Sequence, residues 1–366
     1  MHFIHQLPDW PQMIWKSESL AAPLAAVRHE QGRHLGKMEV LGFDLRAEAN
    51  LEVLTTEVVK SWAIEGETLS TDEVRSSIAS ELGLPTAGLP TPSREVQGIV
   101  ELMLDATTNF GSSLTADRLF GWHAALFPTG RSELTKITVG AWRPKEAGPI
   151  QAVSGSLERQ TVRFEAPDAT RLESEMAYFL EWFNSGPSID PVLKAGIAHL
   201  WFLTIHPFEA GNGRIARAIG ALALARADKT KDRFYSLSTQ IESVREPYYF
   251  ELGAAQRGKL DITDWLQWFL ECLDGAIAGA DQTLGTVLRK AKIWQLINRA
   301  PVNERQRLVI NRLLEGFKGF ITTTKYAKLA RCSPDTALRD MRELVEREVL
   351  TKNPGGGRST SYRLVD

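Results

Sequence analysis

Apolar side chains recur three or four residues apart along most of the chain, the spacing that places them on one face of an α-helix. In one such segment, Leu51, Leu54, Val58 and Trp62 share a face. The pattern predicts a mainly helical protein. We expect helices at residues 24–41, 51–65, 70–82, 93–110, 115–127, 171–183, 192–205, 215–227 and 263–273, and three more at 305–317, 322–331 and from 333 onward.

One stretch departs from this helical pattern. Residues 137–143 and 149–154 have the composition of short strands, and a turn that contains Pro and Gly separates them. The pattern predicts a β-hairpin inside a helical protein. Taken by itself, an ordinary two-stranded excursion between helices explains it.

Residues 206–217, with the sequence HPFEAGNGRIAR, form a short polar loop between two strongly apolar helices. Pro207 restricts the backbone of His206 and ends the first helix there. Gly211 and Gly213 allow a tight turn and a close approach of the backbone to a ligand. The second helix begins at about Asn212, so several backbone N–H groups at its start have no partner within the helix.

Arg214 and Arg217 stand three residues apart near that helix start. A helix N-terminus already carries positive partial charge, so two cations there are unfavourable unless an anion fills the site. N–H groups and two guanidinium groups suit a chain of phosphates, and His206 beside them titrates in the range of a general base. The alternative is a capped helix–loop–helix whose arginines bind surface carboxylates, which leaves His206, Asn212 and the glycines unexplained.

The loop resembles the signature of Fic-domain (Fido) proteins, His-Pro-Phe-x-acidic-Gly-Asn-Gly-Arg-x-x-Arg, and only Ala210 departs from it. The resemblance implies a protein adenylyltransferase, which transfers AMP from ATP to a Ser, Thr or Tyr hydroxyl of a target protein and of itself. His206 is then the catalytic base. The nucleotide-binding residues that the signature implies are Gly211, Asn212 and Gly213 at the α-phosphate and Arg214 and Arg217 at the outer phosphates.

Ala210 occupies the position whose acidic side chain binds Mg²⁺ in the family, so the metal ligand in this chain is unknown. Mg²⁺ keeps several waters and is held largely by substrate phosphates. We therefore still expect Mg²⁺ to accompany ATP, without its usual protein ligand.

The helix at 51–66 ends in Ser61-Trp62-Ala63-Ile64-Glu65-Gly66. A glutamate in the last turn opposes the helix dipole, so Glu65 gains from a nearby cation. The hexapeptide resembles the Fic inhibitory motif, which begins with Ser61 and ends with Glu65 and Gly66. The resemblance implies that Glu65 pairs with Arg217 and blocks seating of the γ-phosphate; taken alone, an exposed glutamate at a helix end is the commoner meaning.

Two further regions resemble parts of the nucleotide and target sites of the family. Residues 137–164 resemble the hairpin flap, which implies that a target protein docks on it by strand addition. The flap segment over the nucleotide corresponds to Val153, Ser154, Gly155 and Ser156. Tyr249 and Gln256 resemble the residues beside the adenine, although a tyrosine at a helix start is more often part of the core.

These features divide the chain into an N-terminal helical region at 1–110, a Fic core at 111–280 and a separate unit at 285–366. The last unit has the order helix, helix, helix, hairpin, which is typical of a winged helix. Residues 318–363 hold ten Lys and Arg against five Asp and Glu. DNA binding through Thr336, Arg339, Arg342 and Arg358 is therefore an option, as is a protein–protein module.

Composition adds limits on the cellular setting. The formal net charge is -2, so the chain as a whole does not suit a polyanion. It has two cysteines, no N-terminal signal pattern and no apolar stretch long enough to cross a bilayer, so we expect a cytoplasmic protein. Two rival functions stay open, a nucleotide-sensing DNA-binding regulator and a catalytically weak scaffold. The oligomeric state, including a homodimer, is also open.

Overall fold

The computed structural model describes residues 2–86, 88–154, 161–186, 188–299, 302–314, 317, 319–354 and 360–365. The chain divides into two compact units, residues 1–281 and 282–366, with the boundary inside one long helix. The two units are described separately. Both are mainly helical, as the sequence predicts.

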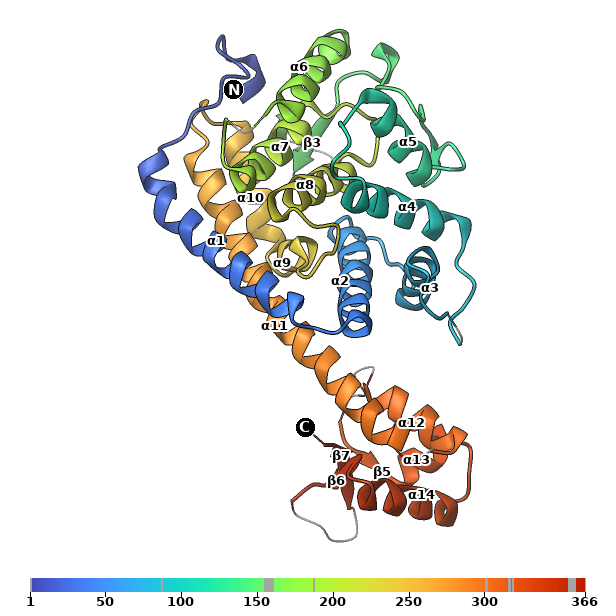
Figure 1. The fold of residues 1–366 in the computed structure, drawn as a ribbon. Helices are drawn as coiled ribbons and strands as arrows, with labels where there is room; N and C mark the ends of the chain where they lie inside the picture. Colours follow the sequence, from blue (N-terminus) through green and yellow to red (C-terminus); the bar gives the residue numbers. More distant parts are fainter. Residues whose placement is uncertain are drawn as a thin grey trace. The chain divides into compact units, whose positions relative to one another are not determined.

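The first unit is built from helices around a central pair, α7 and α8, that packs together (Figure 1). Its helices are α1 (Ser17–Glu39), α2 (Phe43–Ile64), α3 (Thr71–Glu81), α4 (Arg94–Thr108), α5 (Ala116–Leu126), α6 (Leu172–Asn184), α7 (Pro191–Ile205), α8 (Asn212–Asp228), α9 (Leu237–Ser243), α10 (Arg245–Gln256) and the start of α11 (Thr263–Arg299). Short 3-10 turns lie at Ile4–Gln6, Lys145–Ala147 and Ala169–Arg171. Nearly all of α7 is buried, as are thirteen of the first fourteen residues of α8, so the loop between the two helices is held by the core.

Hydroxyl side chains start three of these helices where the sequence places them. Ser70, Ser93 and Thr115 each accept a hydrogen bond from the backbone N–H three residues on. Three other helices are longer than expected, and the first of them is α1, which was expected at residues 24–41 and begins at Ser17. The helix expected at residue 51 begins at Phe43, and the one expected to end at residue 273 continues to Arg299.

The expected hairpin is wrong in its pairing. Strand β3 (Gln151–Ser154) pairs antiparallel with β4 (Thr161–Glu165), not with residues 137–143. The backbone N–H groups of Thr138, Gly140 and Arg143 are directed instead to the Glu209 carboxylate, the His123 ring and the Pro207 carbonyl. Segment 137–143 therefore braces the loop at 206–217. A separate pair, β1 (Arg131–Ser132) and β2 (Thr135–Lys136), precedes it.

The second unit contains the end of α11, then α12 (Glu304–Leu314), β5 (Ile321–Thr322), α13 (Thr323–Leu329), α14 (Pro334–Glu346), β6 (Leu350–Lys352) and β7 (Ser361–Leu364). The strands form an antiparallel sheet in the order β5-β7-β6. Ser333 caps α14, as expected. This element order is typical of a winged helix, which stays an interpretation, and Arg358 lies outside the described residues. Among the described residues, no helix is both long and apolar enough to cross a membrane.

Candidate active site

The loop between α7 and α8 has a backbone that few side chains tolerate. His206 ends α7 in the left-handed region at φ 50°, and Gly211 precedes α8 at φ 80°. A Cβ atom at Gly211 would lie 2.8 Å from the Phe127 ring, and one at Gly213 would lie 2.2 Å from Glu65 Oε1. Glycine is therefore required at residue 211, by its left-handed backbone and by the ring that follows α5, whereas at Gly213 the close neighbour is the movable carboxylate at the end of α2.

Asn212 shapes this loop from within. Its amide oxygen accepts the N–H of Phe208 at 3.0 Å, and its amide nitrogen donates to the Phe208 carbonyl at 2.8 Å. The side chain is buried. The role expected for Asn212 at the α-phosphate stays a prediction, and this geometry favours a role in holding the turn that presents the N–H groups of α8.

Arg217 is buried and is held by the end of α2. Its Nε donates to Ser61 Oγ and its Nη2 to the Ser61 carbonyl, both at 2.7 Å. Nη2 also lies 2.8 Å from Glu65 Oε1, and this ion pair is 30% exposed on the glutamate side but 2% on the arginine side. The Nη1 atom is buried without a hydrogen-bond partner among the described residues. The structure thus brings Ser61, Glu65 and Arg217 together.

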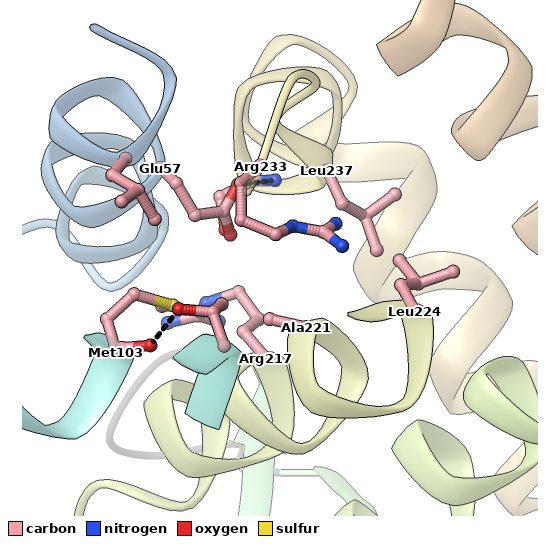
Figure 2. Close-up of a pocket in the computed structure, with 10 residues that line it drawn as sticks. Glu57, Met103, Arg217, Ala221, Leu224, Arg233 and Leu237 are labelled. Carbon is pink, nitrogen blue, oxygen red and sulfur yellow. Dashed lines mark hydrogen bonds between the residues drawn. The ribbon is translucent and has the colours of Figure 1, made fainter. Parts of the chain in front are cut away.

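A small cavity lies beside Arg217, between α2, α4, α8 and α9 (Figure 2). Glu57 and Arg233 face it from one side, and Arg217 and Met103 from the other. It offers about 10 Å³ to the centre of a water molecule, which is room for about one water. A nucleotide cannot fit in this cavity.

Arg214 is also buried and also faces the end of α2. Its guanidinium lies 5.0 Å from the Trp62 ring centroid and 5.2 Å from that of Phe127. Nη1 donates to Glu67 Oε2 at 3.2 Å. Burial lowers the pKa of Arg214, an effect that Glu67 partly offsets. Its Nε is buried with no hydrogen-bond partner in the part of the chain that the structure describes.

His206 stands half-buried at the mouth of the loop. Burial disfavours the imidazolium, and with the nearby positive charge of Arg143 it lowers the pKa of His206 to about 4. The ring is therefore neutral near pH 7 and able to accept a proton. Arg143 also fixes the loop, because its Nε donates to the His206 carbonyl at 2.9 Å.

His123 is a structural residue, as the sequence favours. Its ring stacks on Phe208 with centroids 4.2 Å apart, Nδ1 accepts the Gly140 N–H and Nε2 donates to the Ala210 carbonyl at 3.3 Å. With both nitrogens engaged, it holds the loop and cannot act as a base.

The residues expected beside the adenine and over the nucleotide do not cluster as closely as Ser61, Glu65 and Arg217 do. Tyr249 on α10 is 43% exposed, and its hydroxyl donates to the Ile64 carbonyl at 3.3 Å. Gln256, seven residues along the same helix, is buried. Val153 and Ser154 lie in β3, whereas Gly155 and Ser156 lie outside the described residues.

The residues present do not form a resident magnesium site. Ala210 offers only its carbonyl, which binds His123, and the neighbouring Glu209 carboxylate accepts the Thr138 N–H at 2.7 Å. Among the described residues, no group of three or more His, Cys, Asp or Glu side chains is placed to hold a metal ion.

Two residues of the site were not expected from the sequence. Arg143 has no sequence signal, because its contacts join segments more than sixty residues apart. Glu67 has a weak sequence signal, because it is a second acidic residue two positions after Glu65.

Comparisons with known proteins find a family match over the region that contains the loop. Residues 113–224 match the Fic/DOC family, and residues 3–84 match a domain of unknown function, DUF4172. Protein adenylyltransferase fic-1 of Caenorhabditis elegans is 28% identical over 201 residues, which are 54% of this chain and 36% of that protein. Protein adenylyltransferase Fic of Nematostella vectensis is 25% identical over 225 residues, 60% of this chain and 47% of that protein. The matches span less than half of each relative.

Among solved structures, a Fic family protein from Desulfovibrio desulfuricans G20 is similar over 97% of this chain and 98% of that one, with a TM-score of 0.56 and 21% identity. A Fic domain containing signaling protein from Bacteroides thetaiotaomicron covers 71% of this chain and 98% of that one, with a TM-score of 0.51 and 18% identity. At these identities the likeness shows the fold alone. The Fic-like helical fold expected from the sequence is confirmed.

Proposed function

Because residues 113–224 form a Fic domain, we propose that this protein is an adenylyltransferase that moves AMP from ATP to a Ser, Thr or Tyr hydroxyl of a target protein and of itself. One observation carries the proposal: the two buried arginines at the start of α8 each keep an N–H donor without a partner among the described residues, and His206, whose ring is neutral near pH 7, ends the helix before them. The relatives named protein adenylyltransferase support the same activity.

The transfer follows from the groups around the loop. Arg214 and Arg217 bind the outer phosphates of ATP, and the N–H groups at the start of α8 bind the α-phosphate. His206 accepts the hydroxyl proton as the hydroxyl oxygen bonds to the α-phosphorus. The bond between the α-phosphorus and the bridging oxygen breaks, and pyrophosphate leaves with its charge held by the arginines. Any Mg²⁺ arrives with ATP as part of the substrate, since the chain supplies no carboxylate at residue 210.

The same geometry supports autoinhibition by Glu65. The carboxylate already pairs with Arg217 and lies against Gly213, where the phosphates would approach the helix start. A γ-phosphate and Glu65 need the same guanidinium. The protein therefore rests in a low-activity state until Glu65 leaves, which is the role that the inhibitory motif implies.

Partners follow from the surfaces. The target protein docks on the hairpin formed by β3 and β4, through strand addition to its edge. In the second unit, a groove of about 560 Å³ on α14 is lined by Arg339 and Arg342 but also by Asp335, Glu343 and Glu346. This mixed charge suits a protein partner better than DNA, so the DNA-binding regulator is the weaker alternative.

The test is incubation of purified protein with ATP labelled at the α-phosphate, followed by detection of labelled protein. We expect Glu65→Gly to label at least about tenfold faster than the wild type, the gain expected when a competing charged contact worth about 1.4 kcal/mol is removed. Adding His206→Ala should abolish labelling while ATP still binds, because only the base is lost. Adding Arg217→Ala should cancel the gain, because the released group is missing. Equal labelling by wild type and Glu65→Gly would remove the inhibitory role, and undiminished labelling without His206 would remove the mechanism.

A further inference from the structure

The segment that follows α2 places a second carboxylate on the other signature arginine. We propose that Glu67 is a second inhibitory residue, which occupies Arg214 while Glu65 occupies Arg217. The inference rests on the proposed function, because it concerns the same phosphate site. The inference goes beyond inhibition by Glu65, because it predicts that removal of Glu65 alone leaves Arg214 still blocked by Glu67.

The contact is direct. Arg214 Nη1 lies 3.2 Å from Glu67 Oε2, and the arginine side chain is 9% exposed while that of the glutamate is 46% exposed. The guanidinium lies near two aromatic rings, those of Trp62 and Phe127. A cation in such surroundings is poorly solvated, so it gains strongly from an anion. Glu67 supplies that anion while the nucleotide is absent.

The backbone explains why Glu67 reaches Arg214. Gly66 adopts φ +86°, a left-handed conformation that turns the chain at the end of α2. The Glu67 N–H then donates to the Trp62 carbonyl at 3.2 Å, and the neighbouring Glu65 N–H donates to the same carbonyl at 3.0 Å. One turn thus fixes both acidic residues, and each faces a different arginine of α8.

The exposure of the Glu67 carboxylate indicates that it competes with phosphate for Arg214 and is not a permanent structural partner of that arginine. Because nearly half of the Glu67 side chain is open to solvent, it can leave Arg214 and be hydrated at small cost. A phosphate that arrives at Arg214 meets the same Nη1 donor and is repelled by the glutamate if the glutamate stays. The buried Nε adds a donor that Glu67 does not fill. Phosphate and Glu67 are therefore alternative partners of one guanidinium.

The proposal makes a prediction specific to the outer phosphates. In Glu65→Gly, Arg217 is free but Arg214 still carries Glu67, so ATP binds below the full affinity of the site. Glu67→Gln keeps the size of the side chain and removes its charge. Added to Glu65→Gly, it should tighten ATP binding by about two- to fivefold, the value of one partly exposed charged contact. AMP has no outer phosphates, and its affinity should stay unchanged.

The experiment is calorimetric titration of Glu65→Gly, Glu65→Gly with Glu67→Gln, and Glu65→Gly with Glu81→Gln, using ATP and then AMP. Glu81 is an exposed glutamate at the end of α3, so its variant controls for the loss of one negative charge. Of the two added substitutions, we expect only Glu67→Gln to tighten ATP binding. The gain in affinity should shrink as the salt concentration is raised. Thermal unfolding of each variant checks that the fold is kept.

The outcomes separate two failures. If Glu65→Gly binds ATP and Glu67→Gln leaves that affinity unchanged, the second inhibitory contact does not exist. If Glu67→Gln weakens ATP binding, Glu67 orients Arg214 for phosphate, which is the opposite role. If no variant binds ATP, the proposed function fails and takes this inference with it.

Discussion

The start of α8 and the middle of α14 hold buried charge in opposite ways. At α8, Arg217 and Arg214 meet carboxylates that are 30% and 46% exposed, and each arginine keeps a buried nitrogen without a partner among the described residues. In the second unit, the buried carboxylate of Asp340 accepts hydrogen bonds from Arg305, Asn303 and Tyr326. The first cluster is open and the second is closed.

The difference indicates what each cluster is for. Burial alone would raise the pKa of Asp340, but its hydrogen bonds, chiefly from Arg305, hold that pKa below the ordinary value. Such a satisfied cluster joins α12, α13 and α14 and has no capacity left for a ligand. The α8 cluster keeps unused donors and exposed counter-charges, which is the arrangement expected of a site that exchanges partners.

The largest effect should come from breaking the closed cluster. Arg305→Ala leaves the Asp340 carboxylate, which is 2% exposed, without its cation, and a buried charge that loses its partner destabilises the fold around it. Hydrogen exchange should rise in peptides of α14 and stay unchanged in α7 and α8. Arg307→Ala, an exposed neighbour on α12, is the control and should have little effect. Equal exchange in the two variants would show that the cluster is not closed by Arg305.

The contact between His123 of α5 and the loop at 206–217 should make the free energy of unfolding depend on pH. The pKa of His123 is lowered to about 4, chiefly by burial, against 6.5 in the unfolded chain. The unfolded state therefore binds more protons between these values, so stability is present above pH 6.5 and is lost as pH falls toward 4. Over this pH range, one such histidine lowers the free energy of unfolding by about 3 kcal/mol.

The measurement is urea unfolding at several pH values across that window, for the wild type and His123→Gln. Glutamine keeps a donor and an acceptor but does not titrate, so the slope of the unfolding free energy with pH should be smaller in the variant. Other buried histidines contribute equally to both proteins and cancel in the difference. Identical slopes would mean that His123 is charged in the folded state, in conflict with its hydrogen bond from Gly140.

The parts of the molecule fixed by local chemistry could be predicted from the sequence. Ser70, Ser93, Thr115 and Ser333 begin helices because a hydroxyl satisfies an N–H three residues on, a rule that needs no tertiary information. The loop at 206–217 is likewise recognisable from local sequence, because its glycines and its arginines occur within twelve residues.

The parts decided by distant segments could not be predicted. The strand propensity of residues 137–143 gave the wrong hairpin, because the N–H of Thr138 finds Glu209 and that of Gly140 finds His123. The early start of α2 has no local sequence signal either. Arg75 of α3 pairs with Glu48 and so stabilises the first turns of α2, and this contact joins two separate helices. The spacing of charges in sequence cannot show such pairs.

A smaller effect should come from opening the α8 cluster further. Glu65→Gly leaves Arg217 buried with Ser61 as its remaining partner, and loss of one partly exposed charged contact costs about 1 to 2 kcal/mol. Unlike the damage at Asp340, this loss should be reversed by a ligand. ATP should raise the melting temperature of Glu65→Gly by more than that of the wild type, because phosphates replace the carboxylate.

Glu81→Gly is the control for the glycine itself, since Glu81 also lies at the end of a helix. Its melting temperature should fall by a similar helix-propensity cost, without a larger response to ATP. An equal response to ATP in wild type and Glu65→Gly would indicate that Glu65 does not compete with the nucleotide.

The smallest effect concerns the metal that accompanies ATP. The resemblance to the signature implies that a carboxylate at residue 210 would face the phosphates of a bound ATP, and in this chain the Ala210 side chain packs against the core instead. Ala210→Asp should therefore lower the Mg²⁺ concentration for half-maximal labelling by about tenfold or less, the value of one added ligand worth about 1 kcal/mol. The measurement is a magnesium titration of labelling in the Glu65→Gly background at fixed ATP. Ala210→Asn adds a similar volume with a neutral oxygen and should shift the titration less. If the three titrations coincide, Mg²⁺ is held by phosphates and water alone, and residue 210 contributes no ligand to it.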